Sequence, residues 1–348
     1  MTNVLITGVT GMAGSHLAEF CLANVPNAKV YGVKRWRSQM NNVEHLVDQV
    51  NLIDCELTDA FAVSNLIEAT KPDFIFHLAA QSFVPESWNS PAATIANNTA
   101  MQLNIFEAVR RQGLKPRIQV ALSSEEYGKV LEHELPISEN NPLRPLSPYA
   151  VSKVTQDMLA YQYNQSYGLH VVRTRGFNHE GPRRGDVFVT SNFAKQIAQI
   201  ELGIKPPVLH VGNLQAKRDW TDVRDMVRGY WMALQSCTPG EDYVICSGVT
   251  RTIQEMLDLL LTMSNVKIEV KVDPARLRPS DVEVLWGDCS KFKKATGWDT
   301  TISFEKMMGD LLDYWRLELR RRAPGAIAGG NSEQKIPVQK TSSTSAKN

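Results

Sequence analysis

Tyr149 and Lys153 stand four positions apart in the run PYAVSK. If this run is helical, both side chains lie on one face, because positions i and i+4 are neighbours on a helix. An ammonium group near a phenol favours the phenolate and lowers the phenol's pKa. The tyrosine then becomes usable as an acid and base near neutral pH. A Tyr-x-x-x-Lys pattern alone is common by chance, so its meaning depends on the residues that accompany it.

A second set of reactive side chains stands upstream, in the run SSEEYG at residues 123–128. The run follows a predicted strand, and the carboxyl ends of parallel strands form the edge where such sheets bind ligands. Taken singly, Ser123 and Ser124 are explained by turn chemistry, and Glu125 by a solvated surface acid. Together with the Tyr-Lys pair they predict an acid-base site. Glu126 is a weaker candidate, because neighbours on a strand point to opposite faces.

A glycine-rich loop, GVTGMAG at residues 8–14, lies between a predicted strand and a predicted helix. Gly8, Gly11 and Gly14 permit a tight turn and let backbone N–H groups approach a pyrophosphate at a helix N-terminus. A glycine triplet alone is weak evidence, but a strand before it and a helix after it favour a dinucleotide-binding loop. The alternative is an ordinary turn between a strand and a helix.

The end of the second predicted strand bears on the choice between NAD and NADP. An acid there holds the ribose 2′-hydroxyl, whereas arginine accommodates a 2′-phosphate. The run GVKRWRS at residues 32–38 contains Lys34, Arg35, Arg37 and Ser38 and no acid, which favours NADP. The alternative is a solvated basic loop or a subunit contact, since charged clusters are often only surface.

Short β-rich runs alternate with longer helical runs through the first half of the chain. The predicted strands cover residues 3–7, 29–33, 50–53, 73–78, 117–122 and 170–175, and the predicted helices cover 15–22, 61–69, 94–111 and 151–167. This alternation predicts a parallel sheet covered on both faces, and right-handed crossovers make it doubly wound. The predicted fold class is α/β, a Rossmann-type doubly wound parallel sheet with a smaller C-terminal α/β substrate lobe.

The second half has a different pattern, with helices predicted over residues 188–202, 223–234, 252–263 and 304–321 and one short strand over 267–272. We therefore predict a Rossmann domain over residues 1–177, whose sheet leaves room for a later strand. A smaller lobe over 178–322 completes a cleft over the sheet. Residues 323–348 have almost no large apolar side chains and are predicted to be a disordered tail.

The composition argues against several classes of protein. The 348 residues are 43% hydrophobic and 22% charged, values of a globular protein with a large core. The formal net charge of +1 argues against a general nucleic-acid binder and a polybasic membrane protein. No apolar run approaches the ~20 residues of a membrane span. The N-terminus runs straight into a strand, so we expect no signal peptide.

The five cysteines are an odd number, are widely scattered and contain no C-x-x-C pair. This argues against a disulfide scaffold and a zinc ribbon. We therefore expect no metal site and a reduced, cytoplasmic setting.

Taken together, these motifs resemble the extended short-chain dehydrogenase/reductases that act on nucleotide sugars. The shared features are the glycine loop, HLAA at residues 77–80, the SSE strand end and the Tyr-Lys pair, and the resemblance covers about residues 1–320. Within that superfamily the chain is most similar to the GDP-mannose 4,6-dehydratases. The most telling runs are NHEGPRRG at 178–185, FVT at 188–190, GNL at 212–214 and RDW at 218–220. The dehydratases also place Glu two residues before the Tyr-Gly pair, as Glu125 stands here, whereas the 4-epimerases usually carry a hydroxyl residue there.

The resemblance implies a role for each candidate catalytic residue. Tyr149 takes the proton of the sugar 4-hydroxyl while hydride passes from C4 to NADP⁺, and Lys153 lowers the pKa of Tyr149 and holds the nicotinamide ribose. Ser123 stands where the family often has Thr and hydrogen-bonds the 4-oxygen, with a less fixed rotamer because the methyl group is missing. Glu125 removes the C5 proton and helps to expel the 6-hydroxyl as water. The hydride then returns to C6, which regenerates NADP and gives GDP-4-keto-6-deoxy-D-mannose.

The resemblance also implies two sets of binding residues. The cofactor contacts are Gly8, Thr10, Gly11, Met12, Gly14, Arg35, Arg37, Ser38, Glu56, Leu57, Leu78, Ala79, Ala80, Ser82, Tyr149, Lys153, His179 and Arg184. The substrate contacts are Ser82, Ser123, Ser124, Glu125, Asn178, Val189, Lys195, Arg218 and Arg278. Arginine suits a diphosphate because its planar fork donates two hydrogen bonds at once. The family more often has Asp where Glu56 stands. A surface ion pair is the alternative for each charged substrate contact, and a structural loop role is the alternative for His179.

Two other functions stay open. The NADPH-dependent reductase that converts GDP-4-keto-6-deoxymannose to GDP-rhamnose shares the fold, the loop and the Tyr-Lys pair. It can also carry the SSEEYG strand end, and residues 246–263 and 277–280 resemble it too. The run PRRG at 182–185 and the basic loop at 34–38 favour the dehydratase, which retains its cofactor while a reductase must exchange it. A non-catalytic dinucleotide sensor would have a broken Tyr-Lys pair or lack the strand-end acid.

The expected partner is a small nucleotide sugar, GDP-mannose, with no nucleic acid and no membrane. Similar enzymes pair the helices that correspond to residues 94–111 and 151–167 into a four-helix dimer contact, and similar dehydratases form tetramers. We therefore expect a homodimer or a homotetramer.

Overall fold

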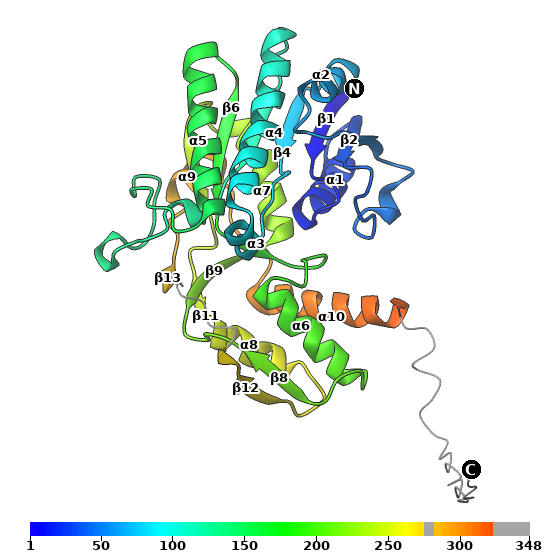
Figure 1. The fold of residues 1–348 in the computed structure, drawn as a ribbon, viewed down its shortest axis with the longest axis vertical. Helices are drawn as coiled ribbons and strands as arrows, with labels where there is room; N and C mark the ends of the chain where they lie inside the picture. Colours follow the sequence, from blue (N-terminus) through cyan, green and yellow to red (C-terminus); the bar gives the residue numbers. More distant parts are fainter. Residues whose placement is uncertain (275–281, 323–348) are drawn as a thin grey trace, which may run out of the picture.

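A seven-stranded parallel sheet forms the centre of the computed structural model, which describes residues 1–274 and 282–322 (Figure 1). The strand order is β10-β6-β5-β4-β1-β2-β3. The strands are β1 (Thr2–Thr7), β2 (Ala28–Lys34), β3 (Asn51–Asp54), β4 (Phe74–His77), β5 (Arg117–Ala121), β6 (Val171–Gly176) and β10 (Asp242–Ile245). The chain moves to opposite sides of β1 when it forms β2 and β4. The gap between β1 and β4 is therefore the topological switch point, where open α/β sheets bind ligands.

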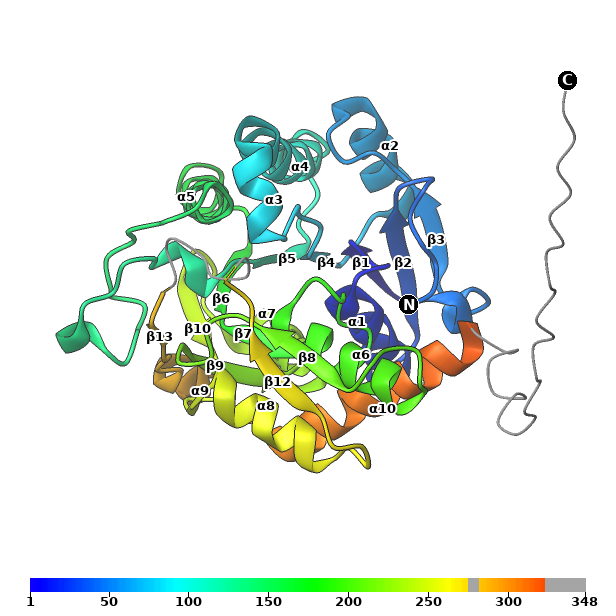
Figure 2. The same cartoon turned by 60° about the horizontal axis from the view of Figure 1, so that its bottom comes forward.

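Alternate residues of each strand pack against different helices. Val4 and Ile6 of β1 join a buried cluster with α1 (Met12–Asn24), α7 (Val223–Ser236) and α9 (Ser290–Thr296). Leu5, between them, joins a second cluster with α2 (Ala60–Thr70), α4 (Pro91–Arg111) and α5 (Pro148–Tyr167). Strand side chains alternate between faces, and Figure 2 shows the two helical layers on either side of the sheet. The predicted doubly wound α/β fold is confirmed.

The smaller lobe occupies the lower part of Figure 1. Its core lies among α6 (Val189–Glu201), α8 (Ile253–Thr262), α10 (Phe304–Arg322), β8 (Val208–Val211) and β9 (Lys217–Asp222). β9 pairs with β7 (Asn178–Glu180), β11 (Thr250–Thr252) and β13 (Val284–Leu285), while β8 pairs with β12 (Glu269–Val272). The remaining elements are the short helix α3 (Val84–Asn89) and the 3-10 turns η1 (Glu44–Leu46), η2 (Ser124–Glu126) and η3 (Glu132–Glu134).

Parts of the second half of the chain return to the large sheet. β10 is its edge strand beside β6, and α7 packs against α1, β5 and β6. The two lobes therefore interleave along the chain after residue 177. The tail predicted at 323–348 lies outside the described residues. Within the described ranges, no helix is both long enough and apolar enough to cross a membrane.

The beginning of α5 differs from the sequence-based boundary. The helix begins at Pro148 instead of residue 151, because the Ser147 side chain accepts a hydrogen bond from the Ala150 N–H at 3.1 Å. A serine cap followed by proline is a favourable helix start. This start places Tyr149 in the first turn of α5. The strands β7, β8, β9, β10, β11 and β13 lie outside the predicted strands, because such short runs lack a readable period.

Candidate active site

The glycine loop lies at the switch point, against the loop that follows β4. Gly8 has a φ of +70°, and a Cβ at this position would lie 3.0 Å from the backbone of Ala79. A Cβ on Gly14 would lie 2.3 Å from the Gly8 carbonyl oxygen. Both positions therefore require glycine. The resulting cradle at the N-terminus of α1 fits a pyrophosphate, which backbone N–H groups there attract.

Thr7 and His77 hold the loop after β4. Thr7 Oγ1 accepts the backbone N–H groups of Leu78 and Ala79, both at 3.1 Å, and therefore donates to His77 Nδ1 at 3.0 Å. Burial, and then the charge of Lys153, lowers the pKa of His77 to about 3. The ring is thus neutral and can accept at Nδ1. These bonds fix the backbone of two residues predicted to lie along the cofactor.

Tyr149 and Lys153 lie on the buried face of α5. Lys153 Nζ donates to the Ala121 carbonyl oxygen at 2.7 Å and lies 5.9 Å from the centre of the Tyr149 ring. Burial lowers the pKa of Lys153 to about 8, although the charge of Glu126 raises it. Burial raises the pKa of Tyr149 above its ordinary value. This is opposite to the lowering expected from the Tyr-Lys spacing, because desolvation outweighs the Ser123 hydrogen bond and the charge of Arg184 that favour the phenolate.

Ser123 and Glu125 lie beside Tyr149. The Ser123 side chain hydrogen-bonds the Tyr149 hydroxyl, and Ser123 Oγ accepts the Glu125 N–H at 3.2 Å. The charge of Glu125 acts on the Tyr149 phenol, and Ser124 is buried behind them. The fold thus brings the four predicted catalytic side chains to one end of the sheet, with Lys153 one turn along α5 from Tyr149.

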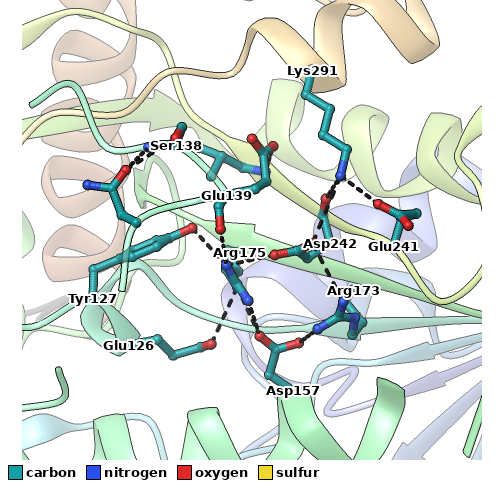
Figure 3. Close-up of polar contacts among 12 residues, drawn as sticks. Glu126, Tyr127, Ser138, Glu139, Asp157, Arg173, Arg175, Glu241, Asp242 and Lys291 are labelled. Carbon is teal, nitrogen blue, oxygen red and sulfur yellow. Dashed lines mark hydrogen bonds and ion pairs between the residues drawn. The ribbon is translucent and has the colours of Figure 1, made fainter. Parts of the chain in front are cut away.

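Glu126 is not on a strand, as the sequence-based interpretation assumed, but at the end of the 3-10 turn η2. It is fully buried, accepts the Ser123 N–H at 2.9 Å and lies 3.6 Å from Arg175 Nε. Arg175 in turn pairs with Asp157 at 2.6 Å and with Asp242 at 2.7 Å (Figure 3). We call Glu126, Asp157, Arg175 and Asp242 the Arg175 network. Sequence reasoning missed it because its members come from four separate elements.

His179 lies in β7, and Arg184 follows in the loop between β7 and α6. His179 Nδ1 donates to the Phe177 carbonyl at 3.1 Å, an assignment that follows from its carbonyl partner. Burial and the charge of Arg184 lower the pKa of His179 to about 4, so Nε2 is an acceptor. The Arg184 guanidinium lies 3.4 Å from the centre of the Phe188 ring and pairs with Glu180 at 3.3 Å. Its charge opposes the rise in the pKa of Tyr149, so Arg184 lies close to this phenol.

The carboxylate of Glu19 joins the PRRG run to helix α1. Glu19 Oε1 lies 2.6 Å from both Arg183 Nη2 and His45 Nε2, and Oε2 lies 3.3 Å from His16 Nδ1. Burial raises the pKa of Glu19, but hydrogen bonds from His16 and Arg183 lower it overall to about 2. Arg183 has a φ of +71°, which is uncommon for a residue other than glycine. We call these four side chains the Glu19 clasp. The sequence singled out the PRRG run but not its anchor.

The basic loop after β2 is only partly available to a phosphate. Lys34 pairs with Asp54 of the neighbouring strand at 2.6 Å, and Arg37 lies 4.3 Å from the Trp36 ring centre. Ser38 Oγ accepts the Arg35 N–H at 3.1 Å, which closes the turn with Arg35 exposed. The run at residues 32–38 contains no acid, but Asp54 of the neighbouring strand β3 places a carboxylate beside Lys34.

The other predicted cofactor contacts border this region. The Thr10 carbonyl accepts a hydrogen bond from Asn42 at 2.9 Å, and Met12 is the first residue of α1. Glu56 is exposed and hydrogen-bonds Thr58, whereas Leu57 is buried. Ala80 and Ser82 lie in the loop that follows β4.

The predicted substrate contacts lie mainly in the smaller lobe. Asn178 is the first residue of β7, and Val189 is the first residue of α6. Lys195 in α6 pairs with Asp186 at 2.5 Å. Arg218 in β9 donates to the Lys217 carbonyl at 2.8 Å. Arg278 lies outside the described residues. In the described part of the chain, no three metal-ligating side chains gather into a possible metal site.

The switch-point glycine loop and the Tyr-Lys pair define a dinucleotide-dependent enzyme of the short-chain dehydrogenase/reductase class. A family profile described as GDP-mannose 4,6 dehydratase matches residues 5–311. The chain belongs to the GDP-mannose 4,6-dehydratase family, as its motifs predicted.

Individual relatives agree with this assignment. The chain is 36% identical to the GDP-mannose 4,6-dehydratase of Yersinia enterocolitica, over 90% of this chain and 93% of that protein. It is 36% identical to GDP-mannose 4,6 dehydratase 2 of Arabidopsis thaliana, over 95% and 91%. A solved structure of RMD from Pseudomonas aeruginosa, complexed with NADPH, matches with a TM-score of 0.80 and 29% identity, over 91% of this chain and all of that one.

Proposed function

We propose that this enzyme converts GDP-D-mannose to GDP-4-keto-6-deoxy-D-mannose. C4 of the sugar is oxidised, water is lost across C5 and C6, and C6 is reduced, so the reaction involves no net oxidation. The observation that carries the proposal is the meeting of Ser123, Glu125 and Tyr149 at the carboxyl end of β5, beside the glycine cradle.

The phenolic oxygen of Tyr149 takes the proton of the sugar 4-hydroxyl. Burial disfavours the phenolate, but the Ser123 hydrogen bond and the charge of Arg184 favour it. Ser123 also holds the 4-oxygen in line with Tyr149. Lys153, fixed by the Ala121 carbonyl, supplies a positive charge on the same helix face and hydrogen-bonds the nicotinamide ribose.

Glu125 takes the proton from C5, which the neighbouring 4-ketone makes acidic, and delivers a proton to the departing 6-hydroxyl. The side chain is half-buried, so it meets the sugar while part of it stays hydrated. Glu126 cannot share this role, because its carboxylate is fully buried against Arg175.

We infer that the cofactor is NADP. When bound, it takes hydride from C4 and returns it to C6. The glycine cradle at α1 would hold its pyrophosphate, and Arg35, Arg37 and Ser38 would hold its 2′-phosphate. Lys34 contributes less to this site, because Asp54 already neutralises it.

We assign the nucleotide sugar to the smaller lobe and the cofactor to the large sheet. Asn178, Val189, Lys195, Arg218 and Arg278 hold the substrate nucleotide and diphosphate. Lys195 is paired with Asp186, so a diphosphate at this position competes with that carboxylate.

The test is incubation of the purified protein with GDP-mannose and no added reductant, followed by mass spectrometry of the nucleotide sugar. Loss of one water supports the dehydratase. An unchanged GDP-mannose mass, with turnover only of the 4-keto-6-deoxy sugar plus NADPH, identifies the reductase instead. A Tyr149→Phe variant, assayed in parallel, shows whether turnover in either assay depends on this site.

A further inference from the structure

Glu126 sits directly behind two of the proposed catalytic residues. Its backbone belongs to the turn η2, and its carboxylate accepts the Ser123 N–H at 2.9 Å, while Ser123 Oγ accepts the Glu125 N–H at 3.2 Å. The two bonds form a reciprocal capping box. Because the box closes on the Glu126 carboxylate, this side chain fixes the backbone that presents Ser123 and Glu125.

The other carboxylate oxygen of Glu126 faces the Arg175 guanidinium at 3.6 Å. Arg175 is itself buried and held by two oxygens of the network, at 2.6 Å from Asp157 and 2.7 Å from Asp242. Its Nη1 also donates to the Tyr127 hydroxyl at 3.1 Å. Figure 3 shows the guanidinium at the centre, with acids from three elements around it. The position of Glu126 is therefore set by the buried ion pairs between α5, β6 and β10.

Helix α5 connects this network to the proposed catalytic pair. Tyr149, Lys153 and Asp157 follow one another at intervals of four residues, so they lie along one face of α5. All three are buried. The face of α5 that presents Tyr149 and Lys153 to the sugar therefore also presents Asp157 to Arg175. Glu126 packs against this face.

The groups around Glu126 act on its charge in opposite directions. Burial and Asp157 raise the pKa of Glu126 well above its ordinary value, and Arg175 lowers it. The carboxylate in turn raises the pKa of Lys153 and of Tyr149, against the larger effect of burial on Lys153.

We propose that Glu126 is a positioning residue that holds the turn of Ser123 and Glu125 in place. The proposal rests on the function proposed above. It assigns separate duties to two adjacent acids, since Glu125 exchanges protons with the sugar and Glu126 acts only through the backbone of Ser123 and Glu125.

Two variants test whether the acceptor oxygen of Glu126 is what the turn requires. Glu126→Gln keeps an oxygen that accepts the Ser123 N–H but cannot ionise, and Glu126→Ala removes both properties. The matched control is Glu139→Gln, which neutralises a partly buried acid beside the same network. Glu139 bonds the Val244 N–H at 2.7 Å and makes no contact with Ser123, so this control should behave like the parent. Thermal unfolding and NADP binding show whether each variant is folded.

We expect Glu126→Ala to lower kcat at least ~10-fold, because small misplacements of reacting groups cost up to about 10²-fold in rate, with little change in KM for GDP-mannose. Glu126→Gln should recover most of this loss, because its amide oxygen still accepts the Ser123 N–H.

The proposal is overturned if Glu126→Ala turns over like the parent, or if a folded Glu126→Gln loses as much kcat as is expected of Glu126→Ala. The second outcome decides the question even if Glu126→Ala does not fold. These outcomes differ from failure of the proposed function, in which the parent itself leaves the mass of GDP-mannose unchanged.

Discussion

Single residues at the end of β5 have unequal surroundings although they are adjacent in sequence. Glu125 is half-buried next to the Tyr149 phenol, while Glu126 is fully enclosed by Arg175 and Asp157. A proton-transfer group has to reach the substrate, and an enclosed acid cannot do so. The two side chains have the same type, so only their different exposure distinguishes the proposed base, Glu125, from the proposed positioning residue, Glu126.

Replacement of Glu125 by glutamine tests the elimination step. Glu125→Gln keeps the size of the side chain but cannot take the C5 proton, so we expect dehydration to fall about 10²–10⁴-fold. C4 oxidation should continue, so the absorbance of reduced nicotinamide should accumulate on the enzyme. Stopped-flow absorbance and product mass measure the two steps. Loss of NADP binding, or normal dehydration, would contradict the role given to Glu125.

The choice of cofactor depends on Arg35. Removing a charged hydrogen-bond donor costs about 1.5–3 kcal/mol, so Arg35→Ala should weaken NADP binding roughly 10- to 100-fold and leave NAD binding nearly unchanged. Titration of both cofactors by calorimetry measures the shift. Arg111→Ala, at an exposed arginine of α4, serves as the control. An unchanged preference would mean that the basic loop serves another purpose.

At the scale of elements, three loops converge because their strands are neighbours. The loops after β1, β4 and β5 carry the glycine cradle, Leu78–Ala79 and Ser123–Glu125. Parallel strands bring all their carboxyl ends to one edge. The Ser147 cap then sets the start of α5 so that Tyr149 faces this edge.

The Glu19 clasp joins α1 to the loop that carries Arg184. Because the folded pKa of Glu19 is lowered to about 2, its contribution to stability is present above its unfolded pKa of about 4.3 and is lost as the pH falls toward 2. Glu19→Gln should therefore lower the free energy of unfolding by roughly 1 kcal/mol at pH 7. The difference from the parent should shrink between about pH 4.5 and pH 2.

Denaturant unfolding at several pH values measures this difference. Glu107→Gln on α4 is the control, because Glu107 also has a pKa of about 2 through Arg110 but lies away from the PRRG run. Only Glu19→Gln should also weaken NADP binding. Equal NADP binding in the two variants would show that the clasp does not support the cofactor site.

At the scale of the whole molecule, helix α5 has two differently occupied faces. One carries Tyr149, Lys153 and Asp157 into the interior, and the other leaves an apolar groove of about 480 Å³ open. The groove is lined by Pro145, Val151, Val154, Thr155, Met158, Leu159 and Gln162. Exposed apolar patches of this kind mark association surfaces, and we propose that this groove lies at the dimer contact that the family resemblance implies.

Charge placed in this groove should disrupt self-association. Met158 is 44% exposed, and Met158→Lys would bury an unpaired ammonium in a dimer, at a large cost in free energy. We expect sedimentation to show a smaller assembly than that of the parent. Leu317→Lys, at an apolar side chain of α10 that is 50% exposed, should leave the assembly unchanged. If both variants sediment like the parent, α5 is not the contact.

The class of fold and most candidate catalytic residues were readable in the sequence because they depend on local spacing. Strand and helix periods, the glycine loop and the four-residue step from Tyr149 to Lys153 are properties of adjacent residues. The return of β10 and α7 to the large sheet could not be predicted in the same way. The order of elements along the chain does not determine which sheet a late strand joins.

Only the tertiary structure determined the environment of each group. Asp54 neutralises Lys34, Glu19 anchors Arg183, and Arg175 gathers acids from three elements, all through contacts between distant parts of the chain. Burial likewise raises the pKa of Tyr149, opposite to the effect expected from its spacing to Lys153. Desolvation depends on every atom that surrounds a group, and those atoms are assembled only when the chain folds.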